Sequence, residues 1–567
     1  MGEPFGRGLV TGAEADPAGD DGVRLWFGVS LLLALFLFFF QLGGFPLFDL
    51  DEAIYAESAR EMLVSGDWLT PRYNERPFFD KPILIYWLTA GAYALFGVNE
   101  FAARLPSALC GLGLLVVVFG FLRTAAGPRL ALLALLILAT SLETITLAHA
   151  ALTDMPLILT LTAGMAAFYL GFERRAWRWF AAGYVAFGLA ALVKGPVAVA
   201  LPALIFTVYT GLQGRFREFV RRARLPLGAL IFLAVAAPWY AAMVQLHGWP
   251  YVEAFFLKHN VRRFTGVIAG HAGSPFYYLG VLVVGFFPWS AFLPAALVSS
   301  WPRRWVDWQP VSSMRRLEMF ALVWAAGVIL FFSLASTKLP NYIGPLLPAV
   351  AILTARWWER LLDGDVWPRR TIGWSAAILV AIAGLFAVLL ALVPVWIRFA
   401  RDRYALAAPY LIEPIELRYG PELLAAVLLV GSIAVALALR RERILDGFLR
   451  LILVVGMFAF MLLAWVVPIA SGYIQGPLRD LAQAAGAALP PDGRLITVGL
   501  KKPSVPFYAG RVALALTAGE DARLRQELSR PGPVMLLGRE SDVGVLSNYS
   551  DLRLRARRGG YLLYANF

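Results

Sequence analysis

The sequence predicts an α-helical polytopic membrane protein that ends in a small α/β domain, and three observations support this fold class. The chain has 567 residues, of which 59% are hydrophobic and only 16% charged, so one soluble core could not bury its apolar side chains. Apolar windows long enough to cross about 30 Å of hydrocarbon recur along the chain. After about residue 470 the composition changes, and short strand-like runs alternate with turn-rich polar stretches.

About thirteen apolar windows are long enough to be transmembrane helices. They lie near residues 24–42, 102–122, 129–149, 154–172, 177–193, 196–212, 226–245, 277–299, 318–335, 341–358, 372–394, 421–439 and 449–470. If the N-terminus lies in the cytoplasm, every second connection should be rich in Lys and Arg. The arginines agree, since they gather at 123–129, 174–175, 215–224, 303–316, 356–370 and 440–450. An odd number of spans then places the C-terminal segment on the outer face.

These patterns predict three regions. Residues 1–22 form a disordered cytoplasmic tail, because they contain too few large apolar side chains to fold alone. Residues 23–470 form the transmembrane domain, with a long first external loop at 43–101. Residues 471–567 form the outer α/β domain, with strand-like runs at 494–499, 534–537 and 561–564.

The charge distribution excludes one kind of partner, and the cysteine count excludes two kinds of structural site. The formal net charge is +13, but the arginines lie in short loops between apolar runs, where membrane orientation explains them. We therefore expect the lipid bilayer, and no nucleic acid, as a partner. Cys110 is the single cysteine, so an intrachain disulfide and a cysteine-based metal site are both excluded.

The first external loop carries a carboxylate and a phenol at helical spacing. Asp51 and Tyr55 are four residues apart, so on a helix they point the same way. Glu52 lies beside them. The alternative is that Asp51 only caps a helix, because Asp is among the commonest N-cap residues.

Polar side chains also occur in the other external connections. In Asp80-Lys81-Pro82 a lysine precedes an apolar helical stretch, a position that favours anions such as phosphate, although a simple helix start explains it as well. The further candidates are Asp154, Lys194, His259, Arg262, Arg263, Lys338 and Tyr342. Taken singly, each has an ordinary explanation, such as a helix C-terminus for Lys194 or a solvated basic loop for Arg262.

Together these residues favour one kind of chemistry. Displacement at an anomeric carbon that bears a phosphate needs cations to stabilise the departing phosphate and a carboxylate to deprotonate or orient the acceptor. Lysines, arginines, carboxylates and tyrosines from separate loops on one side of the membrane meet this need. The residues themselves therefore indicate an anionic lipid-linked substrate at the outer face.

An ordered set of motifs across about residues 24–470 resembles a known family. These motifs are Asp51-Glu52-Ala-Ile-Tyr55-Ala-Glu57, Asp80-Lys81-Pro82, His259-Asn260-Val-Arg-Arg-Phe, Phe287-Pro288-Trp289-Ser290 and Lys338-Leu-Pro-Asn-Tyr342. The set resembles the bacterial aminoarabinose-transferase-like branch of the protein O-mannosyltransferase superfamily, whose members are glycosyltransferases of the GT-C fold.

The resemblance implies an inverting glycosyltransferase in the bacterial inner membrane, with the C-terminal domain in the periplasm. The sugar, 4-amino-4-deoxy-L-arabinose or a related one, would pass from undecaprenyl phosphate to lipid A or another envelope glycolipid. Asp51 matches the central catalytic carboxylate, with Glu52 and Asp154 as further catalytic candidates. The candidates for the donor phosphate and lipid are Tyr55, Lys81, Lys194, Arg262, Arg263, Lys338 and Tyr342.

Two departures from the family pattern bear on specificity and metal binding. Ile54 stands where the family often has Arg, which removes one phosphate contact. Asp80 stands where the family often has Glu. In relatives that carboxylate and the histidine of the middle loop can bind zinc, so Asp80 and His259 are the candidate metal ligands here. A two-ligand site is weak, and we expect that no cofactor is required.

Two other functions remain open. Protein O-mannosyltransferase-type glycosylation would use the same donor chemistry with a Ser or Thr hydroxyl as acceptor. A lipid-linked-sugar transporter or flippase would place polar residues through the membrane midplane and on both faces, whereas the polar cluster here is on one side.

Overall fold

The computed structural model describes residues 20–266, 273–309, 312–404, 415–517, 519–543 and 551–567. The predicted tail at 1–22 lies almost wholly outside these residues. The prediction is corrected for residues 20–22, because these residues form the first turn of α1, which begins at Asp20.

The part of the chain up to residue 474 is almost entirely helical, with short 3₁₀ and π segments labelled η. In chain order the helices are α1 (Asp20–Phe39), α2 (Asp51–Ser65), α3 (Leu84–Phe96), α4 (Glu100–Ala125), α5 (Pro128–Ala139), α6 (Leu142–Ala148), α7 (Asp154–Glu173), α8 (Trp177–Lys194), α9 (Val197–Leu212), α10 (Phe216–Ala223), α11 (Leu225–Val252), η1 (Glu253–Arg262), α12 (Arg263–Thr265), α13 (Tyr277–Gly285), η2 (Trp289–Ala291), α14 (Leu293–Ser300), η3 (Trp305–Trp308), α15 (Ser313–Leu334), η4 (Pro340–Leu346), α16 (Leu347–Leu362), α17 (Val366–Ala391), α18 (Val393–Tyr404), α19 (Gly420–Arg440), α20 (Ile444–Met461), η6 (Leu462–Val466) and α21 (Val467–Ile474).

Each of the thirteen predicted windows coincides with one or more of these helices. Within the described residues, eight helical stretches are long and apolar enough to cross a membrane, or nine if α5 and α6, bent by 66°, form one span. Of the remaining windows, some fall on shorter or interrupted helices, such as α9 and the pair α13 and α14, and one falls on α8, which is long enough but is not among these spans. The chain is therefore a multi-pass membrane protein, and the count of thirteen spans stays a prediction.

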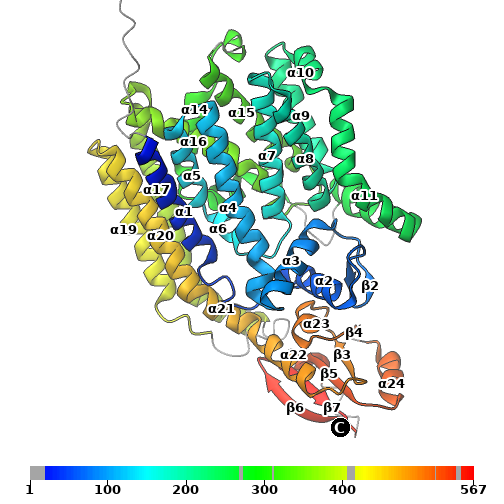
Figure 1. The fold of residues 1–567 in the computed structure, drawn as a ribbon. Coiled ribbons are helices and arrows are strands. Elements are labelled where there is room, and N and C mark those ends of the chain that lie inside the picture. Colours follow the sequence, from blue (N-terminus) through cyan, green and yellow to red (C-terminus); the bar gives the residue numbers. More distant parts are fainter. Residues whose placement is uncertain (1–19, 267–272, 310–311, 405–414, 518, 544–550) are drawn as a thin grey trace, which may run out of the picture.

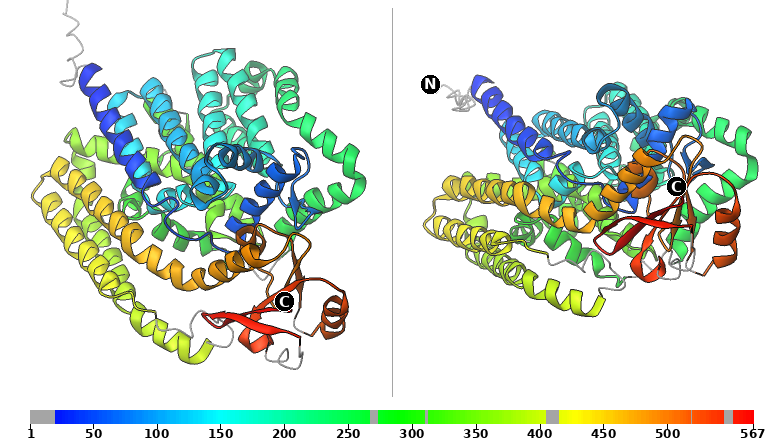
Figure 2. Two further views of the ribbon diagram at one scale, coloured as in Figure 1. Left: turned by 60° about the horizontal axis from the view of Figure 1, so that its bottom comes forward. Right: turned by 90° about the horizontal axis from the view of Figure 1, so that it is seen from below.

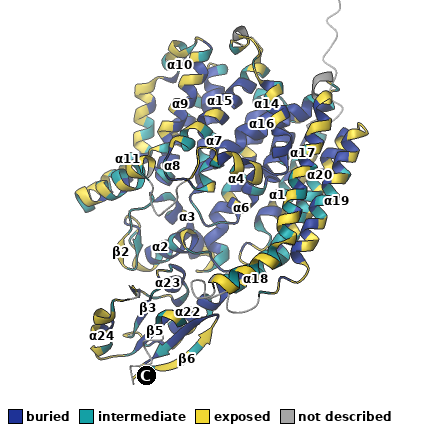
Figure 3. Ribbon diagram, turned by 180° about the vertical axis from the view of Figure 1, so that it is seen from behind, coloured by how far each residue is buried: buried dark blue, intermediate teal, exposed yellow. Residues whose placement is uncertain are grey.

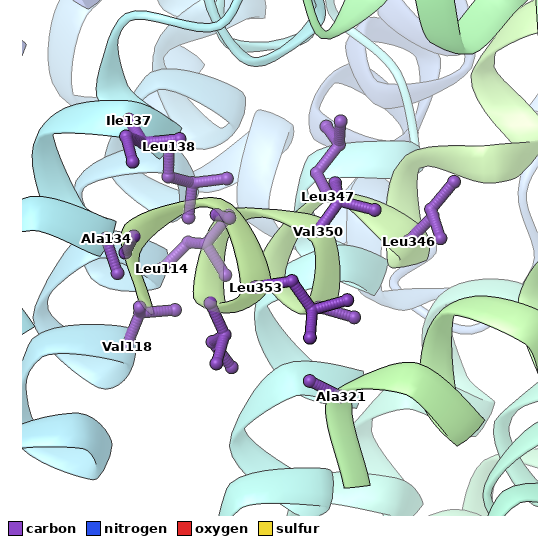
Figure 4. Packing of buried hydrophobic residues seen from close by; sticks show 14 of the residues in the cluster. Leu114, Val118, Ala134, Ile137, Leu138, Ala321, Leu346, Leu347, Val350 and Leu353 are labelled. Atoms are coloured by element: carbon purple, nitrogen blue, oxygen red, sulfur yellow. The ribbon is translucent and has the colours of Figure 1, made fainter. Parts of the chain in front are cut away.

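The helices bury one set of apolar side chains against each other and expose another. Around α16, Leu353 and Val350 pack against Leu114 of α4, Leu138 of α5 and Ala321 of α15, as Figure 4 shows. On α1, α19 and α20 the outer faces are exposed along their length (Figure 3). A lipid environment accommodates such faces, since lipid tails are as apolar as the side chains themselves.

The two ends of the bundle differ in what they carry. The arginine-bearing helix α10 and the start of α1 lie at one end, whereas α2, α3 and the C-terminal strands lie at the other (Figure 1). The first external loop folds into α2, the short strands β1 (Arg72–Tyr73) and β2 (Arg76–Pro77), and α3. Asp51 is the first residue of α2, and the N-cap is Leu50. The alternative that Asp51 is the N-cap residue is therefore wrong.

The C-terminal region is a five-stranded sheet with flanking helices. Its elements are α22 (Gly476–Ala488), β3 (Arg494–Val498), α23 (Ser504–Ala509), β4 (Ala513–Leu516), α24 (Asp521–Ser529), β5 (Val534–Arg539), α25 (Glu540–Val543), β6 (Arg553–Arg558) and β7 (Tyr561–Ala565). The strand order is β4-β3-β5-β7-β6, with β3 parallel to β4 and β5 and with β7 antiparallel to its neighbours. The three predicted strand runs correspond to β3, β5 and β7. Both views in Figure 2 place this region beside α2 and α3, and α23 contacts α2.

One buried arginine fixes the segment that leads into α2. Arg104 of α4 is fully buried and donates to both carboxylate oxygens of Glu52, at 3.0 Å each. It also donates to the backbone carbonyls of Leu42, Phe45 and Pro46 at 2.9–3.1 Å. Glu52 in turn accepts from the backbone N–H groups of Phe48 and Ala151. The exit of α1, the start of α2 and the connection from α6 to α7 are thereby tied to α4.

We predict that Arg104→Met destabilises the folded protein by about 3–5 kcal/mol, because it leaves the Glu52 carboxylate buried and uncompensated. Thermal unfolding of the detergent-purified protein measures the effect. Arg217→Met, which changes an exposed arginine of α10, is the matched control and should leave the melting temperature unchanged. The double variant Arg104→Met with Glu52→Met should recover part of the loss. An unchanged melting temperature in Arg104→Met would contradict the assignment.

Candidate active site

A small polar cavity lies at the end of the bundle that carries α2 and α3. Its volume is about 50 Å³, and it lies between α2, the connection before α3, the start of α7, the end of α8 and η4. The lining residues are Asp51, Tyr55, Asp80, Lys81, Leu152, Thr153, Asp154, Lys194, Leu339, Asn341 and Tyr342. The structure thus brings together seven of the predicted site residues from separate loops.

Both lysines of this cavity are paired with carboxylates. Lys81 Nζ lies 2.8 Å from Asp80 Oδ2, and Lys194 Nζ lies 2.6 Å from Asp154 Oδ1. Lys194 is the last residue of α8, so its charge also favours the helix C-terminus. Its ammonium group lies 5.0 Å from the centroid of the Tyr342 ring. These contacts hold both cations in place, facing the polar cavity.

The protonation states follow from burial and charge. Burial by itself would raise the pKa of Asp80, but the charge of Lys81 and the contact with His259 hold that pKa well below its usual range. Burial, followed by the charge of Asp80, raises the pKa of the Tyr55 phenol well above its usual value. Tyr55 therefore stays protonated and donates to Asp80 Oδ2 at 3.2 Å. The cavity holds an ionised carboxylate and a neutral phenol side by side.

A first apolar cavity of about 400 Å³ adjoins the polar one. The two share Asp80, Lys81, Lys194 and Tyr342, so the lysines lie on their common boundary. The rest of its lining is mostly apolar and aromatic and comes from α9, η1, α12 and α15, including Val197, Phe255, Phe256, Phe264, Phe331 and Phe332. The arrangement can hold an amphiphile whose anionic group meets the lysines while its chain lies among aromatic side chains.

A second apolar cavity of about 410 Å³ borders the polar cavity at a different place. The two share Asp51 and Leu152. Its other apolar lining comes from the segment before α2, from α6 and from the helix around η6, and includes Phe45, Phe48, Leu142, Ile145, Leu462 and Leu463. Asp51 therefore lies between the polar cavity and the second apolar cavity.

Several predicted site residues do not face the polar cavity. Glu52 uses both carboxylate oxygens in the Arg104 network. Lys338 donates to the carbonyls of Ser333 and Ala335 at 2.8 Å each and so caps the C-terminal end of α15. Arg262 is exposed at the end of η1 and lines none of these three cavities. Arg263 begins α12, but its side chain lies outside the described part of the chain.

The candidate metal ligands contact each other directly. His259 Nδ1 lies 2.7 Å from Asp80 Oδ1. Among the described residues no group of three or more His, Cys, Asp or Glu side chains is arranged to hold a metal ion. Zinc takes at least three protein ligands, and Asp80 already contacts Lys81 and Tyr55. In the described part of the chain, Asp80 and His259 therefore supply two ligands, fewer than zinc takes.

Sequence reasoning missed two residues of this region. Asn341 donates to Asp154 Oδ2 at 2.7 Å and holds that carboxylate against Lys194. It lies inside the motif Lys338-Leu-Pro-Asn-Tyr342, so a signal was present. Arg104 is the other, and its signal was an arginine within a predicted transmembrane window, where charged residues are rare and have specific partners.

Comparisons by sequence find one matching family and several similar proteins that share one name. Residues 29–252 match the family described as dolichyl-phosphate-mannose-protein mannosyltransferase. An undecaprenyl phosphate-alpha-4-amino-4-deoxy-L-arabinose arabinosyl transferase from Edwardsiella ictaluri (strain 93-146) is 34% identical over 374 residues, which are 65% of this chain and 65% of that protein. The protein of the same name from Aeromonas salmonicida (strain A449) is 34% identical over 57% of this chain and 58% of its own. The chain therefore matches less than two thirds of the length of these relatives.

The fold comparison covers nearly the whole chain. The crystal structure of ArnT from Cupriavidus metallidurans bound to undecaprenyl phosphate superposes with a TM-score of 0.76 at 25% sequence identity. The match covers 96% of this chain and 98% of that one, including the C-terminal region. The chain is thus similar in sequence to the named arabinosyl transferases and in fold, over nearly its whole length, to ArnT from Cupriavidus metallidurans.

Proposed function

We propose that this protein is an inverting glycosyltransferase that moves a sugar from an undecaprenyl-phosphate-type carrier to an amphiphilic acceptor, lipid A or another envelope glycolipid. The observation that carries the proposal is the position of Asp51 and the two lysines. They share one polar cavity, but Lys81 and Lys194 border the first apolar cavity, whereas Asp51 borders the second. Donor and acceptor would then approach the polar cavity from different sides.

The donor fits the first apolar cavity by chemistry. A polyprenyl phosphate combines an apolar chain with an anionic group, and Lys81 and Lys194 stand at the boundary where that group would lie. Both ammonium groups are paired with carboxylates. A bound phosphate would share them, and Asp80 and Asp154 would keep the lysines in position. The names of the curated relatives and the undecaprenyl phosphate bound to ArnT from Cupriavidus metallidurans support the same donor class.

The acceptor fits the second cavity. Its lining around α6 and η6 is largely apolar, which suits the chain of a glycolipid better than a hydrophilic peptide. This favours a glycolipid acceptor over a protein Ser or Thr hydroxyl. The sugar of the curated relatives, 4-amino-4-deoxy-L-arabinose, is the first candidate for the transferred group.

The reaction follows from this placement. An acceptor oxygen beside Asp51 attacks the anomeric carbon, the bond from that carbon to the carrier phosphate oxygen breaks, and the phosphate leaves with the bonding electrons. Lys81 and Lys194 stabilise the charge that develops on the departing phosphate. Attack from the side opposite the leaving group inverts the anomeric carbon. Asp51 orients the acceptor if it is already an anionic phosphate, and acts as a base if it is a hydroxyl.

The same proposal gives a location and an orientation. The basic helix α10 lies at the end of the bundle opposite α2, which carries Asp51 and Tyr55 (Figure 1). Since basic connections stay in the cytoplasm, the N-terminus would be cytoplasmic, and the site and the C-terminal region would face the periplasm of a bacterial inner membrane.

We predict that Asp51→Asn lowers sugar transfer on the order of 10²-fold or more while the melting temperature stays unchanged, because the variant removes the charge that orients or deprotonates the acceptor. Mass spectrometry of lipid A and of other envelope glycolipids, in cells with the wild type, the variant or neither, measures transfer. Asp492→Asn, at an exposed position of the C-terminal region, is the matched control and should transfer normally. A sugar added to a protein in place of a lipid would move the acceptor assignment to protein glycosylation. Normal lipid modification by Asp51→Asn would contradict the role of Asp51.

We predict that chelation of divalent metals leaves transfer unchanged, since Asp80 is paired with Lys81 and contacts His259 directly. Purified protein is assayed with a lipid-linked donor before and after EDTA. A zinc protease in a parallel reaction serves as the control for chelation. Loss of transfer that zinc restores would contradict this prediction.

A further inference from the structure

The residue two positions before Asp51 is bound by the C-terminal region. The Asp49 side chain is fully buried, although the residue borders the second apolar cavity. Its carboxylate accepts from Ser504 N at 3.0 Å and from Ser504 Oγ at 2.7 Å. Lys502 Nζ lies 3.9 Å away, and the amide nitrogen of Gln475, in its hydrogen-bonding orientation, lies 3.2 Å away. These three partners lie at the start of α22 and in the segment from β3 to α23.

Two further contacts join the same parts of the chain. The Tyr508 hydroxyl accepts from Leu47 N at 2.8 Å and donates to Glu100 Oε1 at 3.1 Å. Asn74, in the turn between β1 and β2, exchanges two hydrogen bonds of 3.1 Å with the backbone of Ala513 at the edge of the sheet. The C-terminal region therefore contacts the first external loop at three separate places.

Asp51 lies between two anchors. On one side Glu52 is held by Arg104 of α4, and on the other Asp49 is held by Ser504 and Lys502. A buried carboxylate is costly unless it is hydrogen-bonded or paired, so Asp49 keeps its position only while the C-terminal region supplies those partners. The short segment between the anchors has little freedom to shift Asp51 along or across the polar cavity.

We propose that Asp49 is a positioning residue. Through its contacts with Asp49, the C-terminal region holds the Asp51 side chain in its place at the polar cavity. The C-terminal region thereby contributes to catalysis, although none of its described residues lines the three cavities. This inference rests on the proposed function, because it assigns Asp49 and Ser504 a role in the same transfer reaction.

The expected signature is a loss of turnover without a loss of donor binding. Lys81 and Lys194 do not depend on the Asp49 contacts, so the KM for the lipid-linked donor should stay within about twofold of the wild type. A small displacement of a catalytic group lowers kcat by roughly 10- to 100-fold. Loss of folding, in contrast, would lower the amount of active protein and leave kcat per folded molecule unchanged.

The test compares Asp49→Asn and Ser504→Ala with Ser529→Ala in the full-length, detergent-purified protein. Ser529 makes a local hydrogen bond on α24 to the carbonyl of Gln526, so its variant controls for the loss of a serine in the same region. We expect a lower kcat in the first two variants, wild-type kcat in Ser529→Ala, and partial rescue by the exchange variant Asp49→Ser with Ser504→Asp. Wild-type kcat in both Asp49→Asn and Ser504→Ala would overturn the inference.

Hydrogen–deuterium exchange separates failure of this inference from failure of the proposed function. In Ser504→Ala the amides of residues 47–55 should exchange faster than in the wild type, and those in Ser529→Ala should not. If the wild type transfers no lipid-linked sugar but this coupling appears, the proposed function fails while the mechanical coupling stands. If transfer is normal and residues 47–55 exchange at the wild-type rate in Ser504→Ala, the positioning role is wrong.

Discussion

The buried guanidinium of Arg104 is the constraint on which the end of the bundle around α2 depends. It ties the exit of α1 and the first turn of α2 to α4, and through Glu52 it reaches the connection between α6 and α7. Because every one of these bonds is buried, none can be lost without leaving an uncompensated polar group. The same bonds place Asp51 where the polar cavity borders the second apolar cavity, so the contacts that hold this part of the fold together also set the geometry of the site.

Charge in the polar cavity is balanced by ion pairs and hydrogen bonds. Asp80 and Asp154 pair with Lys81 and Lys194, and Tyr55 and Asn341 donate to the same carboxylates. Unpaired lysines at this depth would be costly, and unpaired carboxylates equally so. A phosphate that enters can share the two ammonium groups without moving them far, which is the preorganisation that electrostatic stabilisation of a leaving group needs.

The fold was predictable from the sequence because its signals are local. Hydropathy located all thirteen helical windows, and alternation with turns located β3, β5 and β7. The site was predictable only in part. Asp51 and Glu52 are adjacent, yet one faces the cavity and the other a buried arginine, and no local pattern distinguishes them. Lys338 looked like a phosphate ligand but caps α15. The contact between Asp49 and Ser504 spans 455 positions, so it emerges only from the tertiary structure.

The measurement that tests this account most directly is an experimental structure of the protein with undecaprenyl phosphate bound in a lipid environment. The account predicts that the phosphate lies within hydrogen-bond distance of Lys81 and Lys194, with the prenyl chain in the cavity lined by α9, η1 and α15. A phosphate bound at the α10 end of the bundle, or a prenyl chain in the cavity between α6 and η6, would contradict it.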